Sequence, residues 1–395
     1  MGKFRIETVN MSLVYFFIFF SFGGLFPLLT VYLRDEVGLS GTEIGMIMSI
    51  GPIIMIFVQP LWGVVSDYTQ RPREIITITM VITGAVALLY LPFSSYAAFL
   101  FIAALVALFQ GAIVPLSDSI TFNFVQKTGG DYGSIRLWGA AGFAVSVLLM
   151  GSLSDLFGLT IIFYGFALAL WLCAFFTRKI PTEGKLTKVD LKKGVSTLLY
   201  SKPFVLFMLV TFFVFGPIFA NNFYFGMLIQ DVGGTLTGVG IAFLLAAGSE
   251  IPFMRWAGRW IERVGLIKIL FLAAFVSSLR WFFYAWEPTP LLIYITTVAQ
   301  GFSIGLFIPA ALQYVRKVAP LDVRVTAVSI YSSFGGGLGA SFCTFFAGLL
   351  LDYFDIFAVY VFFGTLTTLG LVTLIVIMRG KDDSEVKSRG YEQER

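Results

Sequence analysis

Long apolar segments alternate with short polar breaks along almost the whole chain. A helix that spans a bilayer needs about 20 mostly apolar residues, and twelve segments are suited to this role. Gly, Pro and charged residues mark the breaks, as in RDEVGLSG and WEPTP. The pattern predicts an all-α integral membrane protein with twelve transmembrane helices. The predicted spans cover residues 11–33, 44–65, 75–92, 97–122, 134–154, 159–177, 203–229, 236–258, 266–286, 290–314, 325–351 and 356–378.

The placement of basic residues predicts the orientation of these helices. The sequence has 27 Lys and Arg, and such residues concentrate in loops on the cytoplasmic side. If both termini are cytoplasmic, only Arg34, Arg136 and Arg280 lie elsewhere. Arg34 falls in an outer loop, and the other two lie inside apolar segments. We therefore expect a multi-pass protein of the cell membrane with an even number of spans and cytoplasmic N- and C-termini.

The longest polar connection divides the spans into two sets of six. Residues 178–202 carry seven Lys or Arg. We predict an N-terminal six-helix bundle at residues 1–178, a cytoplasmic linker at 179–202, a C-terminal six-helix bundle at 203–378 and a polar, disordered cytoplasmic tail at 379–395. Within the linker, the segment from Val189 to Leu199 fits a short interfacial helix and a plain connection equally well.

The two halves repeat a spacing of small and acidic residues. Gly139, Gly142, Gly151 and Asp155 recur 197 residues later as Gly336, Gly339, Gly348 and Asp352, and Gly63 and Asp67 recur 195 residues later as Gly258 and Glu262. Parallel repeats are typical of carriers whose two bundles rock around a site at the membrane midplane. Because small residues let helices approach closely in lipid, we expect the Gly-rich fifth and eleventh spans to be tightly packed.

Composition narrows the chemistry that the chain can perform. The sequence is 58% hydrophobic and 13% charged, its mean hydropathy is +0.88, and it contains no His. Its two cysteines, Cys173 and Cys343, are isolated in apolar segments. Nothing in the sequence therefore builds a metal site, a cofactor site, a Ser/His or Cys/His dyad or a phosphate-binding P-loop. We expect neither an enzyme nor a nucleic-acid-binding protein, and any proton carrier must be a carboxylate.

Four charged side chains lie deep inside apolar segments: Asp118 and Arg136 in the first half, and Glu250 and Arg280 in the second. A charge at the bilayer centre costs at least about 2.5–3.5 kcal/mol, so such residues usually face a partner or a water-filled cavity and mark a transport path. Each pair is either a structural ion pair or part of a substrate site, where Arg donates and the carboxylate accepts hydrogen bonds. We favour a substrate site between the two halves.

Uncharged polar residues in spans seven and ten are further candidates for solute contacts. Asn221, Asn222 and Tyr224 lie on span seven, and Gln300 lies on span ten. Amides inside an apolar helix must find hydrogen-bonding partners. The partner is either the solute or the helix opposite, and for the two asparagines both alternatives stay open.

Twelve spans, two repeats and a basic middle loop resemble the major facilitator superfamily over nearly the whole chain. GVVSDYTQRPR, after span two, resembles the G-x-x-x-D motif of that superfamily, and GRWIERVG looks like its second copy. Tyr68 and Pro72 depart from the usual pattern of the first copy. The resemblance implies that these residues act in gating, where the acid helps to lock the two bundles. It assigns this role to Gly63, Asp67, Arg71, Arg73, Gly258, Glu262 and Arg263.

Shorter stretches resemble the lactose-permease-like branch, and most closely its phenylpropionate and nucleoside–proton symporters. They are SDSITF, YGSIRLWGAAGF, SEIPFM and LRWFFYA, which contain Asp118, Arg136, Glu250 and Arg280. In lactose permease the acid and arginine of spans four and five bind the sugar, and those of spans eight and nine serve binding and proton coupling. The resemblance carries these roles to the four residues here. Span ten, AQGFSIG, places Gln300 and Ser303 where that branch has His and Glu, so proton coupling falls on Glu250 or Asp118.

These features together predict a secondary active transporter that moves a small polar organic solute across the cell membrane by alternating access. A sugar, a nucleoside or an aromatic acid fits the polar residues, and a monomer is sufficient. Proton-coupled symport is the favoured mode. A drug or metabolite efflux antiporter is one alternative, although span five lacks the Gly-Pro motif of that family. A proton-independent uniporter is the second, because Gln300 and Ser303 replace the coupling pair.

Overall fold

A computed structural model describes residues 2–180, 198, 200–320 and 323–393, and every regular element within these ranges is helical. The first half contains α1 (Gly2–Asp35), α2 (Gly41–Thr69), α3 (Pro72–Ala87), η1 (Leu88–Tyr90), α4 (Tyr96–Gln110), α5 (Ile113–Thr128), α6 (Tyr132–Phe157) and α7 (Ile161–Thr177). The second half contains α9 (Lys202–Asp231), α10 (Leu236–Val264), α11 (Leu266–Tyr284), α12 (Pro290–Thr296), α13 (Val298–Val318), α14 (Arg324–Ser332), η3 (Ser333–Gly339), α15 (Ala340–Tyr353) and α16 (Ile356–Gln393).

The helices coincide with the segments predicted from hydropathy. Within the described residues, eleven helical segments are long and apolar enough to cross a membrane. The sixth predicted span corresponds to α7, Ile161–Thr177, which is also helical and apolar but shorter, with 17 residues. Three spans each combine two α-helices: a short turn separates α4 from α5 and α12 from α13, and α14 continues into α15 through the π-helical segment η3. Non-helical backbone inside a membrane is tolerated where it is buried in protein or lines a cavity.

Local sequence signals set the helix ends. Ser40 and Glu43 form a reciprocal capping box at the start of α2. The carboxylate of Asp131 accepts from the amides of Gly133 and Ser134 at the start of α6, at 3.1 and 2.9 Å. Gly129, with φ of 70°, ends α5 in the left-handed conformation that suits glycine. These caps fix the short turn between the two helices that carry Asp118 and Arg136.

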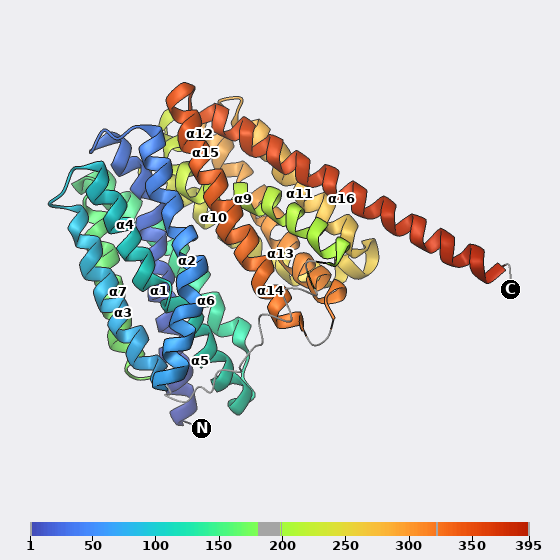
Figure 1. The fold of residues 1–395 in the computed structure, drawn as a ribbon. Coiled ribbons are helices and arrows are strands. Elements are labelled where there is room, and N and C mark those ends of the chain that lie inside the picture. Colours follow the sequence, from blue (N-terminus) through green and yellow to red (C-terminus); the bar gives the residue numbers. More distant parts are fainter. Residues whose placement is uncertain (1, 181–197, 199, 321–322, 394–395) are drawn as a thin grey trace.

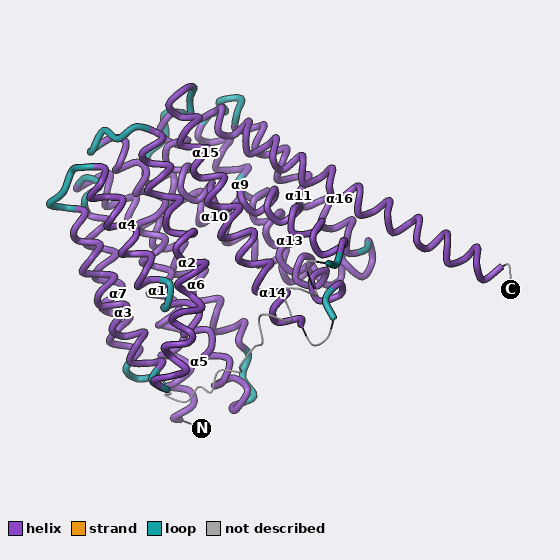
Figure 2. The backbone as a smooth tube through the Cα atoms, viewed as in Figure 1, coloured by secondary structure: helices purple, strands orange, loops and turns teal. Residues whose placement is uncertain are grey.

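The two halves of the chain lie side by side and meet more closely at one end than at the other (Figures 1 and 2). We call the end where α1 begins the proximal end and the end where α1 finishes the distal end. In Figure 1 the halves converge at the distal end, at the top, and diverge toward the proximal end, where the N-terminus lies.

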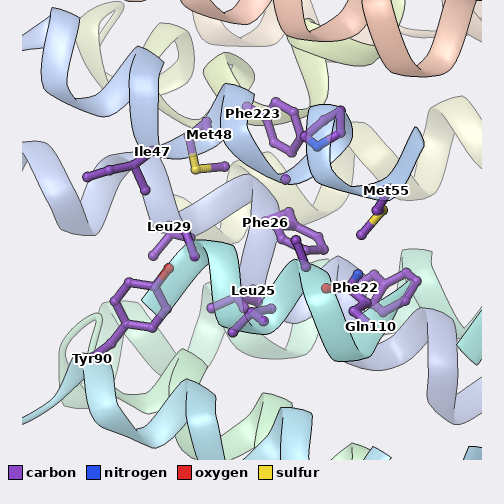
Figure 3. A pocket seen from close by; sticks show the side chains of 15 residues that line it. Phe22, Leu25, Phe26, Leu29, Ile47, Met48, Met55, Tyr90, Gln110 and Phe223 are labelled. Atoms are coloured by element: carbon purple, nitrogen blue, oxygen red, sulfur yellow. The ribbon is translucent and has the colours of Figure 1, made fainter. Parts of the chain in front are cut away.

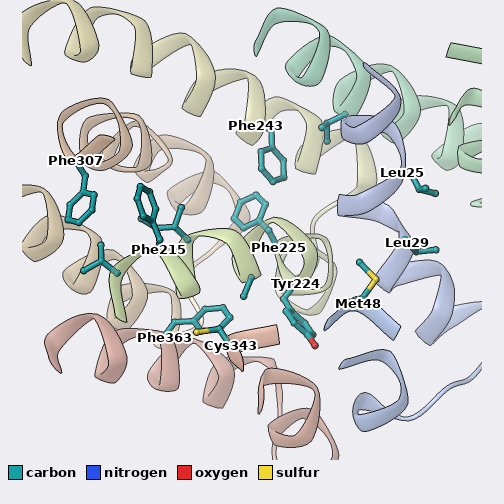
Figure 4. Packing of buried hydrophobic residues seen from close by; sticks show 14 of the residues in the cluster. Leu25, Leu29, Met48, Phe215, Tyr224, Phe225, Phe243, Phe307, Cys343 and Phe363 are labelled. Atoms are coloured by element: carbon teal, nitrogen blue, oxygen red, sulfur yellow. The ribbon is translucent and has the colours of Figure 1, made fainter. Parts of the chain in front are cut away.

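Aromatic rings fill much of the buried core. In the second half, the rings of Phe225 and Phe243 pack edge to face with centroids 5.4 Å apart, and Phe215 and Phe307 do the same at 5.2 Å (Figure 4). Phe243 also meets Phe143 of the first half at 5.6 Å. Such pairs contribute about 0.5–1.5 kcal/mol beyond their buried area.

Glycines allow close helix contacts, as the repeat predicted. A side chain at Gly142 of α6 would collide with the carbonyl of Phe16 in α1, and one at Gly339 would meet the backbone of Phe212 in α9 at 3.1 Å. The fifth and eleventh spans are therefore tightly packed, each against its neighbours.

One prediction for the C-terminus is wrong. Helix α16 continues past the last predicted span to Gln393, so the tail expected to be disordered is helical there. The segment from Val189 to Leu199, whose helical or extended state was left open, lies almost wholly outside the described residues.

Candidate functional site

A cavity of about 820 Å³ lies between the two halves. Helices α1, α5 and α6 form one wall, and α9, α10, α13 and α14 form the other. The residues of the first wall are Phe19, Asp118, Tyr132, Gly133, Arg136, Leu137, Ala140 and Phe143. The residues of the second are Asn222, Phe243, Ala246, Ala247, Glu250, Met254, Gln300, Ile304, Ile308, Leu312 and Ser332. The lining is mostly apolar with a few polar groups, which is typical of small-molecule sites.

The first wall holds Asp118 and Arg136 as an ion pair. The two side chains approach at 3.7 Å between Nε of Arg136 and Oδ1 of Asp118, and about a third of each is exposed. The same oxygen of Asp118 accepts a hydrogen bond from the hydroxyl of Tyr15 at 2.5 Å and another from Tyr132 at 3.0 Å. One carboxylate oxygen is thus anchored by three groups from α1 and α6.

Aromatic rings support the guanidinium of Arg136. Its central carbon lies 4.3 Å from the ring centre of Phe19 and 5.2 Å from that of Tyr15. Cation–π contacts of this kind contribute about 0.5–2 kcal/mol, depending on solvent exposure. Gly139, one turn along α6, keeps the space open, because a side chain there would meet Phe19 at 2.8 Å and Nη1 of Arg136 at 3.1 Å.

The second wall presents Glu250 without an ion-pair partner. Among the described residues, neither a salt bridge nor a hydrogen bond to its carboxylate is observed, although the side chain lines the cavity. Pro252 interrupts the hydrogen bonding of α10 two residues later. Gly301 of α13 packs directly on this segment, since a side chain there would meet the amide of Glu250 at 2.7 Å. Glu250 is therefore held at a tight helix contact while its acid group faces the cavity.

Arg280 lies behind the cavity wall rather than in it. The side chain is 4% exposed, and its Nη1 donates to Oε1 of Gln300 at 2.6 Å. Its central carbon stacks on the ring of Trp281 at 3.9 Å. Within the described residues no carboxylate lies within 4 Å of it, and its Nε and Nη2 have no acceptor. The expected Glu250–Arg280 contact is thus replaced by a contact with Gln300, which stands at the wall.

The three predicted residues of α9 have different environments. Asn222 lines the cavity. Asn221 is buried inside the second half and accepts from the hydroxyl of Tyr360 at 2.8 Å. Tyr224 is also buried there and donates to the carbonyl of Thr344 at 2.7 Å. The helix-to-helix alternative therefore describes the contacts of Asn221 and Tyr224, and only Asn222 faces the cavity.

The predicted gating residues lie at the proximal end, and no hydrogen bond or ion pair from their side chains to a described residue of the opposite half is observed. Arg71 pairs with Glu74 at 3.3 Å, and Arg73 donates to the carbonyl of Ile180 at 3.4 Å, both within the first half. Gly63 and Gly258 have open space where a side chain would be. Asp67, Glu262 and Arg263 show no side-chain partner among the described residues.

Sequence reasoning missed two kinds of residue. Tyr132 lies in a stretch that was singled out for Arg136, but Tyr15 carries no local signal beyond a hydroxyl in a Phe-rich segment. The second kind closes the distal end: Asp155 and Asp352 each accept hydrogen bonds from the first residues of a helix in the opposite half. Their repeat was visible in the sequence, but their partners were not.

A second, smaller cavity of about 250 Å³ is lined mainly by residues of α1, α2 and α4 (Figure 3). Leu25, Leu29, Ile47 and Met48 line it, together with Phe223 of the second half. Gln110 is its main polar group, and the side-chain oxygen of this residue has no hydrogen-bond partner among the described residues. This apolar space lacks the paired charges of the larger cavity, which is therefore the candidate site.

Comparison with known proteins identifies the family. The model of the MFS_1 like family matches residues 8–362 of the chain. The chain belongs to the major facilitator superfamily. Within it, a maltose permease of Geobacillus stearothermophilus is 49% identical over 372 residues, covering 93% of both chains. A probable 3-phenylpropionic acid transporter of Escherichia coli is 25% identical over 358 residues, covering 88% of this chain and 92% of that one.

Solved structures agree with the superfamily fold. The crystal structure of the nucleoside transporter NupG matches with a TM-score of 0.85, covering 94% of this chain and 99% of that one at 16% identity. The resemblance drawn from sequence motifs is confirmed. The protein is a multi-pass membrane transporter of the major facilitator superfamily and not an enzyme.

Proposed function

We propose that the protein is a proton-coupled symporter that imports a sugar, a disaccharide related to maltose, across the cell membrane. One observation carries the proposal: the cavity between the halves is faced by the Asp118–Arg136 pair on one wall and on the other by Glu250, which has no ion-pair partner among the described residues. The identity of 49% to a maltose permease supports the choice of sugar. The cavity volume of about 820 Å³ falls within the range of about 300–1,000 Å³ usual for small-molecule sites.

Sugar binding falls to the first wall. A sugar presents hydroxyl groups that both donate and accept hydrogen bonds. Asp118 is an acceptor and the guanidinium of Arg136 a planar donor, and hydrogen bonds to charged groups are about twice as strong as neutral ones. Asn222 and Gln300 add amides from the second wall. The rings of Phe19 and Phe143 offer apolar surface for the C–H faces of the sugar.

Proton coupling falls to Glu250 in this proposal. Asp118, the other candidate, already accepts two hydroxyl hydrogen bonds beside an arginine, which suits a permanent acceptor. Glu250 has no such partners in the part of the chain that the structure describes, so gaining or losing a proton should change its interactions more than those of Asp118. Gln300 stands on the cavity wall with Glu250 and accepts from Arg280. Sugar contact with Gln300 thereby links solute binding to the fixed charge of Arg280 behind the wall.

Alternating access is the proposed mechanism, with twelve spans and both termini in the cytoplasm. The distal end then faces outward and the proximal end faces the cytoplasm. The halves, bounded at residues 1–178 and 203–378, would rock about the central cavity. The structure then corresponds to an inward-facing state, and the gating residues around Asp67 and Glu262 would meet the opposite half only in the other state. A monomer is sufficient for this cycle.

Uptake of radiolabelled maltose into proteoliposomes tests the proposal, with a nucleoside and an aromatic acid as comparison solutes. We expect maltose to accumulate only with an inward proton gradient, and a protonophore to abolish the accumulation. Glu250→Gln should lose accumulation but keep sugar exchange, whereas Asp118→Asn and Arg136→Gln should weaken maltose binding. Glu287→Gln, the same change at an exposed loop position, is the matched control and should behave like wild type.

Other outcomes would replace the proposal. Equilibration of maltose without dependence on the gradient would indicate a uniporter. Accumulation of a nucleoside or aromatic acid instead of maltose would change the substrate class and leave the coupling intact. Failure of all these solutes to enter, with proton-driven extrusion of amphipathic dyes, would favour an efflux antiporter.

A further inference from the structure

We propose that Tyr15 is a positioning residue that holds Asp118 and Arg136 in the geometry needed for solute binding. The inference rests on the proposed role of the cavity as the solute site. Tyr15 is 1% exposed and is absent from the cavity lining, so it does not touch a solute there itself. It acts from α1 on two residues of α5 and α6 that do line the cavity.

The hydroxyl of Tyr15 fixes which oxygen of Asp118 is engaged by the protein. Tyr15 and Tyr132 both donate to Oδ1, at 2.5 and 3.0 Å, and Nε of Arg136 lies 3.7 Å from the same atom. Within the described residues no donor is observed at Oδ2. The carboxylate therefore cannot rotate without breaking two hydrogen bonds, and its second oxygen remains available to accept from a solute hydroxyl.

The ring of Tyr15 supports the other member of the pair. Together with Phe19, one turn further along α1, it lies beneath the guanidinium of Arg136. Helix α1 is kept at the required distance by Gly142, where any side chain would collide with the carbonyl of Phe16. A rigid surface of α1 thus sets the positions of the acid and the base at once, which is how a binding site is preorganised.

Tyr15→Phe separates the two contributions, because it removes the hydroxyl and keeps the ring. We expect the KM for maltose uptake to rise about tenfold, as for the loss of one hydrogen bond to a charged group. The maximal rate should change less than about twofold, since the hydrogen bond and the cation–π contact observed for Tyr15 among the described residues are both within the first half. A purely structural role would instead lower the amount of folded protein, or the maximal rate, without a selective change in KM.

Tyr90→Phe is the matched control. Tyr90 is 2% exposed in the same half, and its hydroxyl has no hydrogen bond to another described residue. The variant Tyr90→Phe should therefore keep the wild-type KM for maltose uptake. A double-mutant cycle with Asp118→Asn gives the decisive comparison: if Tyr15 acts through Asp118, the double variant should bind maltose no more weakly than Asp118→Asn alone. Weak binding is measured by calorimetry, so that loss of uptake does not hide it.

The outcomes separate this inference from the proposed function. Lack of maltose binding by wild type overturns the proposed sugar, and the cycle is then run with the solute of the comparison panel that wild type does bind. An unchanged KM in Tyr15→Phe, additive losses in the cycle, or an equal loss in Tyr90→Phe would each overturn the positioning role. Wild-type affinity in Asp118→Asn would overturn both.

Discussion

The two ends of the cavity differ in what joins the halves of the protein. At the distal end, Asp155 of α6 accepts from the amides of Leu236 and Thr237 at the start of α10, at 3.2 and 2.8 Å. Asp352 of α15 accepts from the amides of Gly41 and Thr42 at the start of α2, at 2.5 and 2.8 Å. At the proximal end the gating residues show no comparable contact within the described residues. Within the described part of the chain, paired carboxylates join the halves at the distal end, and no such contact joins them at the proximal end.

The two distal contacts have the same arrangement: an aspartate accepts hydrogen bonds from the first residues of a helix in the opposite half. Asp155 and Asp352 are 197 residues apart, and the threonines they bind, Thr42 and Thr237, are 195 apart. Both hydroxyls donate to the same acids as the amides do. A carboxylate at a helix N-terminus meets unpaired amides and the positive end of the helix dipole. The duplication therefore places matching contacts on the two sides of the distal end. Both sets of contacts would have to break when the halves rock apart.

The largest effect should come from forcing the distal contact apart. A side chain at Gly240 would collide with the backbone of Leu148, and one at Gly348 with the carbonyl of Gly41, both across the interface. We expect Gly240→Leu with Gly348→Leu to prevent distal closure and abolish uptake. Val31→Cys reports the change, because Val31 is fully buried and faces Gly226 of α9. In purified protein its reaction with a maleimide should become at least about tenfold faster, which corresponds to about 1.4 kcal/mol.

Gly248→Leu is the control for this pair of substitutions. Gly248 lies on the same helix as Gly240, but a side chain there would meet nothing within 4 Å. Cys173 and Cys343 are both buried and can stay in the background. Unchanged maleimide reactivity in the double leucine variant, with the protein folded, would show that the distal end does not close by this contact.

A smaller effect is expected when the carboxylates alone are removed. An acid at an exposed helix N-terminus contributes about 0.3–1 kcal/mol. Asp155→Asn combined with Asp352→Asn should therefore speed labelling of Val31→Cys by about 3- to 30-fold, and the two single variants should have equal effects. Asp355→Asn is the control, since Asp355 accepts from Ala358 within its own helix start and does not cross the interface. A large effect of one single variant and none of the other would contradict the symmetric closure.

The sequence predicted the spans and the repeated glycines and aspartates, but not the contacts that these residues make at the distal end. Hydropathy located the spans, and the repeat pointed to Gly151, Gly348, Asp155 and Asp352, because periodicity and spacing are local properties of a chain. The partners of these residues lie 80 to more than 300 positions away. Pairing over such distances depends on how the halves dock, which no local pattern encodes.

The candidate site shows the same limit. Buried charge identified Asp118, Arg136 and Glu250, because ionised groups in apolar segments are costly and therefore conspicuous. The sequence also suggested that Arg280 lies near Glu250. In the structure, Arg280 instead donates a hydrogen bond to the side chain of Gln300. Asn221 and Asn222 are adjacent in sequence but have different surroundings, because neighbouring residues on a helix point in different directions. Tyr15 became recognisable only through its contact with Asp118.

The smallest effect should come from the exposed ion pair at the distal end. Arg34 of α1 donates to Asp231 of α9 at 2.9 and 3.1 Å, and its side chain is 28% exposed. Exposed pairs contribute about 0.2–1 kcal/mol, so Arg34→Gln should speed labelling of Val31→Cys by no more than about fivefold. Salt gives the sharper test, because at about 1 M the screening length falls to about 3 Å. High salt should speed labelling of the wild-type background and have less effect on Arg34→Gln. An equal salt response in both proteins would show that this pair does not help to hold the distal end, leaving closure to the carboxylates and the glycines.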